Sequence, residues 1–184
     1  GSVVYDPFSG CGTFALAAWR AGREVIANDV SPYARLLTRS KLFPYASLDE
    51  ALADFKRMAH KVERRRRQPD LRSVPIWVRS FFHEKTLREA LLWANVLKAE
   101  GRWFLLACLM GILHHQRPGF LSFPSSHTVP YLRIKKFPRS RFPKLYEFRP
   151  VADRLEAKVL RAFRRMPKLD FTLSRQCHGA RAET

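Results

Sequence analysis

The stretch that decides the fold runs from Val3 to Thr13 and reads VVYDPFSGCGT. Its β-branched start predicts a short buried strand over residues 3–5, and the residues after it favour a helix over 13–21. Glycine loses more conformational entropy than other residues inside an element, so two glycines around one residue indicate a turn. In α/β folds, a glycine-rich turn between a strand and a helix lies at the carboxyl end of the sheet and holds a ligand.

A second strand and an acid complete this pattern. The strand is expected over residues 24–27, Asn28 and Asp29 follow it, and Ser31-Pro32 is typical of a helix start. Strand, turn, helix, strand and helix form a βαβ half-unit. Asp29 lies near the roughly 20-residue offset at which an acid accepts ribose hydroxyls. An adenosine-containing cofactor is favoured, and a structural turn with a helix-capping acid is the alternative.

Charge is the most unusual feature of the composition. The 184 residues contain 34 Lys and Arg against 16 Asp and Glu, a net charge of +18. This predicts a nucleic acid as the partner first and an anionic membrane surface second, with a solvated basic surface as the alternative. We find no apolar run of about 18 residues and no secretory leader, so no membrane segment is expected. The three cysteines form no CxxC pair, which argues against zinc or disulfides and favours the cytoplasm.

The rest of the chain divides into regions of different character. Hydrophobic periodicity predicts helices over 48–66, 84–99 and 102–115, within a helical region that spans 45–117. Six prolines exclude a long helix over 118–150, where basic and aromatic residues alternate. An amphipathic helix is expected within 151–173, and residues 174–184 are expected to be a frayed tail.

The string DPFSGCGT resembles the first motif of amino-methylating DNA methyltransferases. These enzymes use S-adenosylmethionine (SAM) to methylate the exocyclic amine of cytosine (N4) or adenine (N6). Residues 28–42 are similar to their second motif and the helix after it. Residues 81–114 and 119–133 are similar to a helical region in one bacterial and archaeal branch. The resemblance covers about residues 3–165 and implies an α/β, partial Rossmann-like SAM-methyltransferase fold, with its βαβ start at 1–44.

The resemblance also implies roles for individual residues. The glycine turn would line the methionine side of SAM, Asp29 would hold the ribose, and Val30 would lie beside the adenine. SAM has no phosphate, but its carboxylate suits free backbone N–H groups and its cationic groups suit an acid. The expected cofactor residues are Asp6, Pro7, Phe8, Ser9, Gly10, Cys11, Gly12, Thr13, Asn28, Asp29 and Val30.

The catalytic motif of these enzymes is absent from the sequence. It reads Asp/Asn/Ser-Pro-Pro-Tyr/Phe, and it orients the target amine and stacks on the extruded base. The nearest string, Thr128-Val129-Pro130-Tyr131, lacks the first proline. The sequence therefore predicts the amino-terminal part of a longer or split enzyme, in which a second chain supplies the catalytic half.

Two basic clusters are candidates for DNA contact, because cations bind phosphates and neighbouring aromatics can stack on unpaired bases. A solvated helix end and a loop anchored by its aromatics are the alternatives. The expected nucleic-acid residues are Arg64, Arg65, Arg66, Arg67, Arg133, Lys135, Lys136, Arg139 and Arg141.

The function expected from the sequence is thus a SAM-dependent DNA methyltransferase, or its cofactor-binding part. A non-catalytic nucleic-acid-binding protein that keeps the βαβ unit as a scaffold is one alternative. An RNA methyltransferase is another, because guanine-modifying RNA enzymes have a similar DP-x-x-G-x-G-T string.

Overall fold

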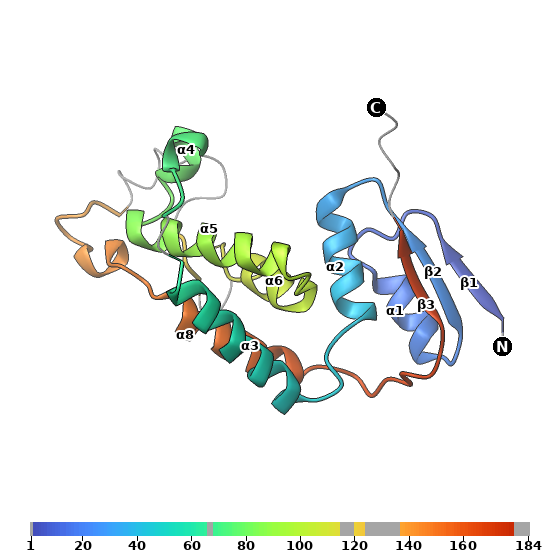
Figure 1. The fold of residues 1–184 in the computed structure, drawn as a ribbon. Helices are drawn as coiled ribbons and strands as arrows, with labels where there is room; N and C mark the ends of the chain where they lie inside the picture. Colours follow the sequence, from blue (N-terminus) through green and yellow to red (C-terminus); the bar gives the residue numbers. More distant parts are fainter. Residues whose placement is uncertain (1, 66–67, 115–119, 124–136, 179–184) are drawn as a thin grey trace. The chain divides into compact units, whose positions relative to one another are not determined.

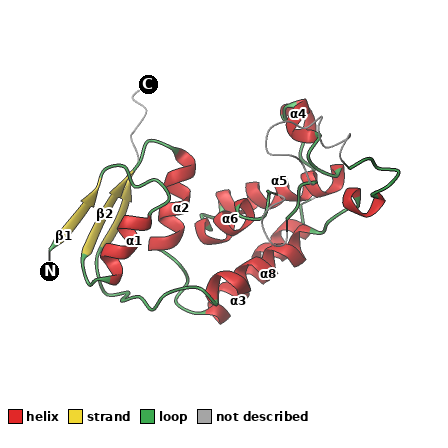
Figure 2. Ribbon diagram, turned by 180° about the vertical axis from the view of Figure 1, so that it is seen from behind, coloured by secondary structure: helices red, strands yellow, loops and turns green. Residues whose placement is uncertain are grey.

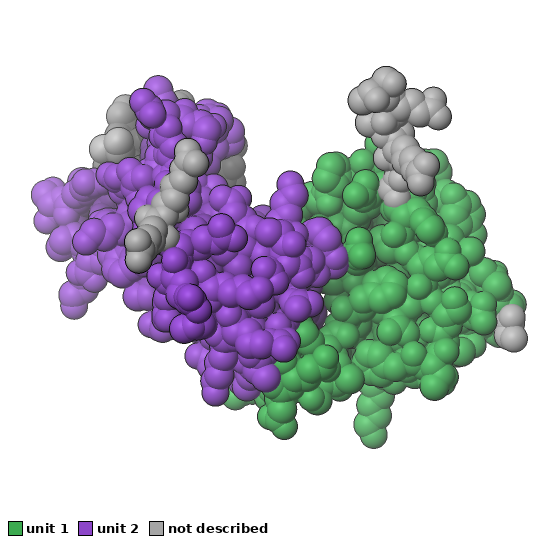
Figure 3. All heavy atoms as spheres, in the orientation of Figure 1, with its two compact units in different colours: residues 1–51, 163–184 green, residues 52–162 purple. Residues whose placement is uncertain are grey.

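The chain forms a mixed α/β structure of two compact units (Figures 1 and 3). The computed structural model describes residues 2–65, 68–114, 120–123 and 137–178. Unit 1 comprises residues 1–51 and 163–184, and unit 2 comprises residues 52–162. Unit 2 is therefore an insertion in the sequence of unit 1.

Unit 1 is built on a parallel sheet of three strands in the order β1-β2-β3. The strands are β1 (Val3–Asp6), β2 (Glu24–Asn28) and β3 (Arg175–His178). Helices α1 (Thr13–Arg20) and α2 (Pro32–Leu42) lie on one side of the sheet (Figures 1 and 2). The predicted βαβ half-unit is thus present.

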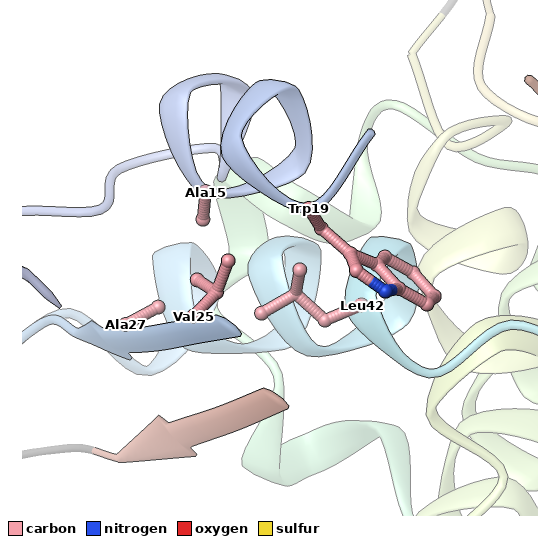
Figure 4. Close-up of a cluster of buried hydrophobic side chains, with 5 residues drawn as sticks. All are labelled: Ala15, Trp19, Val25, Ala27 and Leu42. Carbon is pink, nitrogen blue, oxygen red and sulfur yellow. The ribbon is translucent and has the colours of Figure 1, made fainter. Parts of the chain in front are cut away.

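The core of unit 1 lies between the sheet and these helices (Figure 4). Ala15 and Trp19 of α1 pack with Val25 and Ala27 of β2. Leu42, the last residue of α2, belongs to the same cluster, and all five side chains are almost completely buried. Successive strand residues face opposite sides, so Val3 and Tyr5 of β1 point away from this core. They are 55% and 59% exposed. The expectation of a buried first strand was therefore wrong for these two side chains.

The end of the chain differs most from expectation. Residues 175–178, expected to be part of a frayed tail, form β3, and Ala27 of β2 pairs with Cys177. Leu169, Leu173 and Cys177 pack against the core of unit 1, and the Trp19 indole N–H donates to the Asp170 carbonyl at 2.8 Å. Apolar side chains at alternate positions from 169 are a period-two signal. Burial of these side chains places the polar strand RQCH beside β2.

Unit 2 is helical. Its elements are α3 (Leu48–Glu63, which begins in unit 1), η1 (Leu71–Ser73), α4 (Ile76–Arg79), α5 (Glu84–Ala99), α6 (Trp103–Met110), η2 (Pro143–Tyr146) and α8 (Val151–Phe163). The Phe55 and Trp93 rings stack with centroids 5.4 Å apart and join α3 to α5. Leu97, Leu109 and Leu155 are completely buried.

Three predicted helices end early, and the first of them, expected over 48–66, stops at Glu63. The helix expected over 102–115 stops at Met110, after which the N–H groups of Ile112 and Leu113 donate three residues back, to Leu109 and Met110, instead of four. The helix expected within 151–173 stops at Phe163. In the described ranges, we find no helix with the length and apolar composition needed to span a bilayer.

Candidate functional site

The glycine turn and Asp29 lie together at the carboxyl edge of the sheet. The turn follows β1 and Asp29 follows β2, and parallel neighbours end at the same edge. The Gly10 backbone N–H donates to Asp29 Oδ2 at 2.8 Å, and the Ser9 N–H donates to the Asn28 carbonyl at 2.9 Å. The two elements that the sequence predicts for an adenosine cofactor are therefore in direct contact.

Position 12 requires glycine, both because of its backbone conformation and because Thr38 leaves no space for a side chain. Its φ is +74°, in the left-handed region, and Gly10 has a φ of +52°. A Cβ on Gly12 would lie 2.9 Å from both the Cα and the Oγ1 of Thr38. Any side chain at position 12 would thus push α2 away from the turn.

Two side chains of helix α2 also form hydrogen bonds with the glycine turn. The Thr38 hydroxyl donates to the Gly10 carbonyl at 3.1 Å and lies 3.2 Å from the Ser9 hydroxyl, while Lys41 Nζ donates to the Cys11 carbonyl at 2.5 Å. Sequence reasoning missed Thr38 and Lys41. Their spacing of three residues on the predicted helix, which places them on one face, was the available signal.

The internal bonds correct one expectation about the turn. The glycine turn was expected to let backbone N–H groups approach a ligand, but the Gly10 N–H donates to Asp29 and the Gly12 N–H donates to the Ser9 carbonyl at 2.7 Å. Backbone donors in a tight turn pair within it when acceptors are in reach. The first turn of α1, which has no side-chain cap, offers the remaining N–H groups.

Asp29 keeps acceptor capacity for a ligand. Its Oδ1 accepts the Ser31 N–H at 2.8 Å and its Oδ2 accepts the Gly10 N–H. These bonds, that of Ser31 foremost, lower the pKa of Asp29, so the side chain is ionised at neutral pH. A carboxylate has about four lone-pair positions, so about two remain for the hydroxyls of a ribose.

Asp6 is a buried carboxylate at the end of β1. The residue is 9% exposed, and its side chain has no hydrogen bond or ion pair with any residue in the described part of the chain. A carboxylate at the carboxyl edge of the sheet attracts cationic groups. Asp6 thus fits a cationic group on a ligand at this edge.

The other predicted cofactor residues differ in exposure. Ser9 is buried and Asn28 is half-buried, with its amide N–H donating to the Pro7 carbonyl at 3.5 Å. Phe8 and Val30 are 88% and 76% exposed. Their apolar surfaces are available to a ligand.

Cys11 and Thr13 are exposed neighbours beside the turn. The Cys11 thiol lies 3.1 Å from the Thr13 hydroxyl, and that contact, together with the charge of Lys41, lowers the pKa of Cys11. Across the described ranges, we find no group of three side chains suited to hold a metal ion.

The structure describes only part of the predicted nucleic-acid surface. Arg64 and Arg65 are exposed at the end of α3, where they line one hollow with Arg57, His60 and Lys61. Arg139 lies over the Tyr146 ring at 4.9 Å, and Arg141 is exposed. Outside the described residues lie Arg66, Arg67, Arg133, Lys135, Lys136 and the string Thr128-Val129-Pro130-Tyr131.

Two aromatics of the basic region, Phe120 and Phe123, anchor it within unit 2. Phe123 is 2% exposed, and the buried Arg149 guanidinium lies 4.7 Å from the Phe120 ring centroid and 6.0 Å from that of Phe123. In this part of the region the aromatic side chains therefore anchor the loop, which was the alternative to DNA contact.

Comparison of the whole chain with protein-family models, with curated proteins and with solved structures found no match.

Proposed function

We propose that this chain is the cofactor-binding part of a SAM-dependent DNA methyltransferase that acts on an exocyclic base amine. The observation that carries the proposal is the hydrogen bond of 2.8 Å from the Gly10 N–H to Asp29. It joins the glycine turn and the ribose-type acid at the edge where α/β folds bind ligands.

The side chains at this edge suit the chemical groups of SAM. Asp29 has acceptor positions left for the ribose hydroxyls, and Asp6 is a buried carboxylate for the ammonium or sulfonium. The uncapped first turn of α1 suits the SAM carboxylate. Val30 offers an apolar surface to the adenine. SAM supplies the electrophilic methyl group, and this chain binds and orients it.

A Rossmann-like sheet would continue from β1. In the doubly wound order 3-2-1-4, the next strand pairs with β1 on the edge away from β2. In the described structure this edge pairs with no strand, and Val3 and Tyr5 beside it are more than half exposed. Such an edge accepts a further strand. We therefore propose that a second chain or segment with the Pro-Pro-Tyr/Phe motif adds at β1.

Calorimetric titration with SAM tests the proposal, first with the wild type and then with Asp6→Asn. This nearly isosteric change removes a buried charge, so it should leave the fold stable while it weakens SAM binding by about 1–3 kcal/mol. Asp29→Ala should weaken binding by a similar amount, but it also removes an acceptor from the Gly10 N–H.

Asp170→Ala is the matched control, because Asp170 is an exposed acid of unit 1 that accepts a backbone N–H at 2.9 Å, as Asp29 does. It should bind SAM like the wild type. No heat with the wild-type protein would refute the proposal.

The Gly12 N–H donates to the Ser9 carbonyl at 2.7 Å and so does not face a ligand, which favours a second candidate, a nucleic-acid-binding protein that keeps the βαβ unit as scaffold. This candidate predicts DNA binding without SAM binding, so the same titration separates the two functions.

A further inference from the structure

Three adjoining hollows on unit 2 follow α5, and together we call them the α5 groove. Their volumes are about 520, 290 and 510 Å³. The first and second share Arg65, and the second and third share Asp70. Helix α5 has 16 residues and is therefore about 24 Å long. This length is enough for several nucleotides of a single nucleic-acid strand.

The groove carries an excess of positive charge. Seven Lys and Arg side chains line it, against three acids. Each acid already has a basic partner: Lys61 with Glu100 at 2.6 Å, Arg72 with Asp70 at 2.9 Å and Arg88 with Glu84 at 2.7 Å. The groove therefore has cations left over for an external anion.

Three arginines carry this excess. Arg64, Arg65 and Arg79 have no ion pair or side-chain hydrogen bond with any residue that the structure describes. The charges of Arg65 and Arg79 act on Glu100 and Asp70, but those acids are already paired with Lys61 and Arg72. The Nε of Arg79 is also removed from water without a hydrogen-bond partner. Arg64 and Arg65 lie toward the first hollow and Arg79 lines the third, so the unpaired cations occur at both ends of the groove. This spacing suits a chain of anions rather than a single ion.

The short helix that carries Arg79 also carries an exposed aromatic residue. Trp77 precedes Arg79 on α4 and is 64% exposed, and its neighbour Ile76 is 77% exposed. The Trp77 ring meets the edge of Phe81, with centroids 6.3 Å apart and planes at 86°. Exposed aromatic rings near a basic groove are the surfaces on which proteins stack unpaired bases.

We propose that the α5 groove binds a single DNA strand, with phosphates on Arg64, Arg65 and Arg79 and an unpaired base on Trp77. The choice of DNA rests on the proposed function, but binding in the groove does not require SAM. A concave path with a cation at each end suits a strand better than the flat surface of a bilayer. The sequence alone indicated Arg64 and Arg65 but neither Arg79 nor Trp77.

Fluorescence anisotropy with a labelled 12-nucleotide single strand, without SAM, tests the phosphate contacts. Arg64→Glu/Arg65→Glu should lower affinity at least about tenfold at 0.1 M salt and reduce the slope of log K against log salt by about 1.4. The matched control is Arg164→Glu/Arg165→Glu, an exposed pair in unit 1 with the same change of charge. It should retain most of the affinity and the slope.

An abasic oligonucleotide, which has phosphates without bases, tests the stacking on Trp77. Trp77→Ala should weaken binding of the normal strand about fivefold or more and leave binding of the abasic strand unchanged.

Equal losses of DNA affinity for the groove and control arginine pairs, or tighter binding to phosphatidylserine vesicles than to DNA, would overturn the inference. Calorimetry with SAM on the same variants should match the wild type, so failure of the groove is distinguishable from failure of the SAM site.

Discussion

The contact between Gly12 and Thr38 predicts that Gly12→Ala destabilises unit 1 far more than an ordinary glycine substitution. Alanine at a φ of +74° costs about 1–2 kcal/mol. The added Cβ would lie 2.9 Å from the Thr38 Cα and Oγ1, and overpacking of this kind costs about 1–3 kcal/mol. The expected total is about 2–5 kcal/mol.

Gly22→Ala separates these two contributions. Gly22 has a φ of +73°, but a Cβ there would meet no atom within 4 Å. It should therefore cost only the conformational part, about 1–2 kcal/mol. The difference between the two variants measures the close approach of α2 to the turn, and we expect it to be about 1–3 kcal/mol.

Hydrogen exchange followed by mass spectrometry is the suitable assay, because it reports each unit separately. Peptides that contain residues 24–28 report the opening free energy of unit 1, and peptides from 84–99 provide an internal control in unit 2. Equal costs for Gly12→Ala and Gly22→Ala would refute the reasoning. So would full rescue of Gly12→Ala by Thr38→Ala, since the Thr38 Cα would remain in the way.

Three further predictions concern single side chains. The lowered pKa of Asp29 means that its contribution to the stability of unit 1 is present above the unfolded carboxyl pKa and is lost as pH falls through the lower folded pKa. Asp29→Asn should therefore make urea unfolding of unit 1 less dependent on pH below about pH 4. Iodoacetamide should alkylate Cys11 at a lower pH than an ordinary thiol, and Lys41→Met should move the rate–pH profile of Cys11 upward. Arg149 is 6% exposed and donates to three backbone carbonyls, so Arg149→Met should cost unit 2 about 2–4 kcal/mol in hydrogen exchange.

Local patterns predicted most of the elements of unit 1. The glycine turn, the second strand and the Ser31-Pro32 helix start depend on neighbouring residues, and all three are present; Ser31 caps α2 as expected. The contact between Asp29 and the turn followed from the rule that parallel strands end at one edge.

Interactions between distant segments were not predictable in this way. The strand RQCH has no β-branched residue, and it forms because β2 offers a partner and because Leu173 and Cys177 reach the core of unit 1. The hydrogen bonds from Thr38 and Lys41 of α2 to the glycine turn likewise depend on how α1 and α2 pack together. The α5 groove combines residues from α3, η1, α4 and α5, so no short stretch of sequence reveals it.

The place of β3 in the sheet has a consequence for synthesis on the ribosome. Residues 24–28 emerge long before residues 175–178, which must lie beside them. At ~5–20 residues per second, the translation of the intervening chain takes on the order of ten seconds. Throughout that delay one side of the nascent β2 strand lacks its native neighbour, while the inserted helices can already fold. Chaperone capture during this interval should therefore concentrate on the amino-terminal segment.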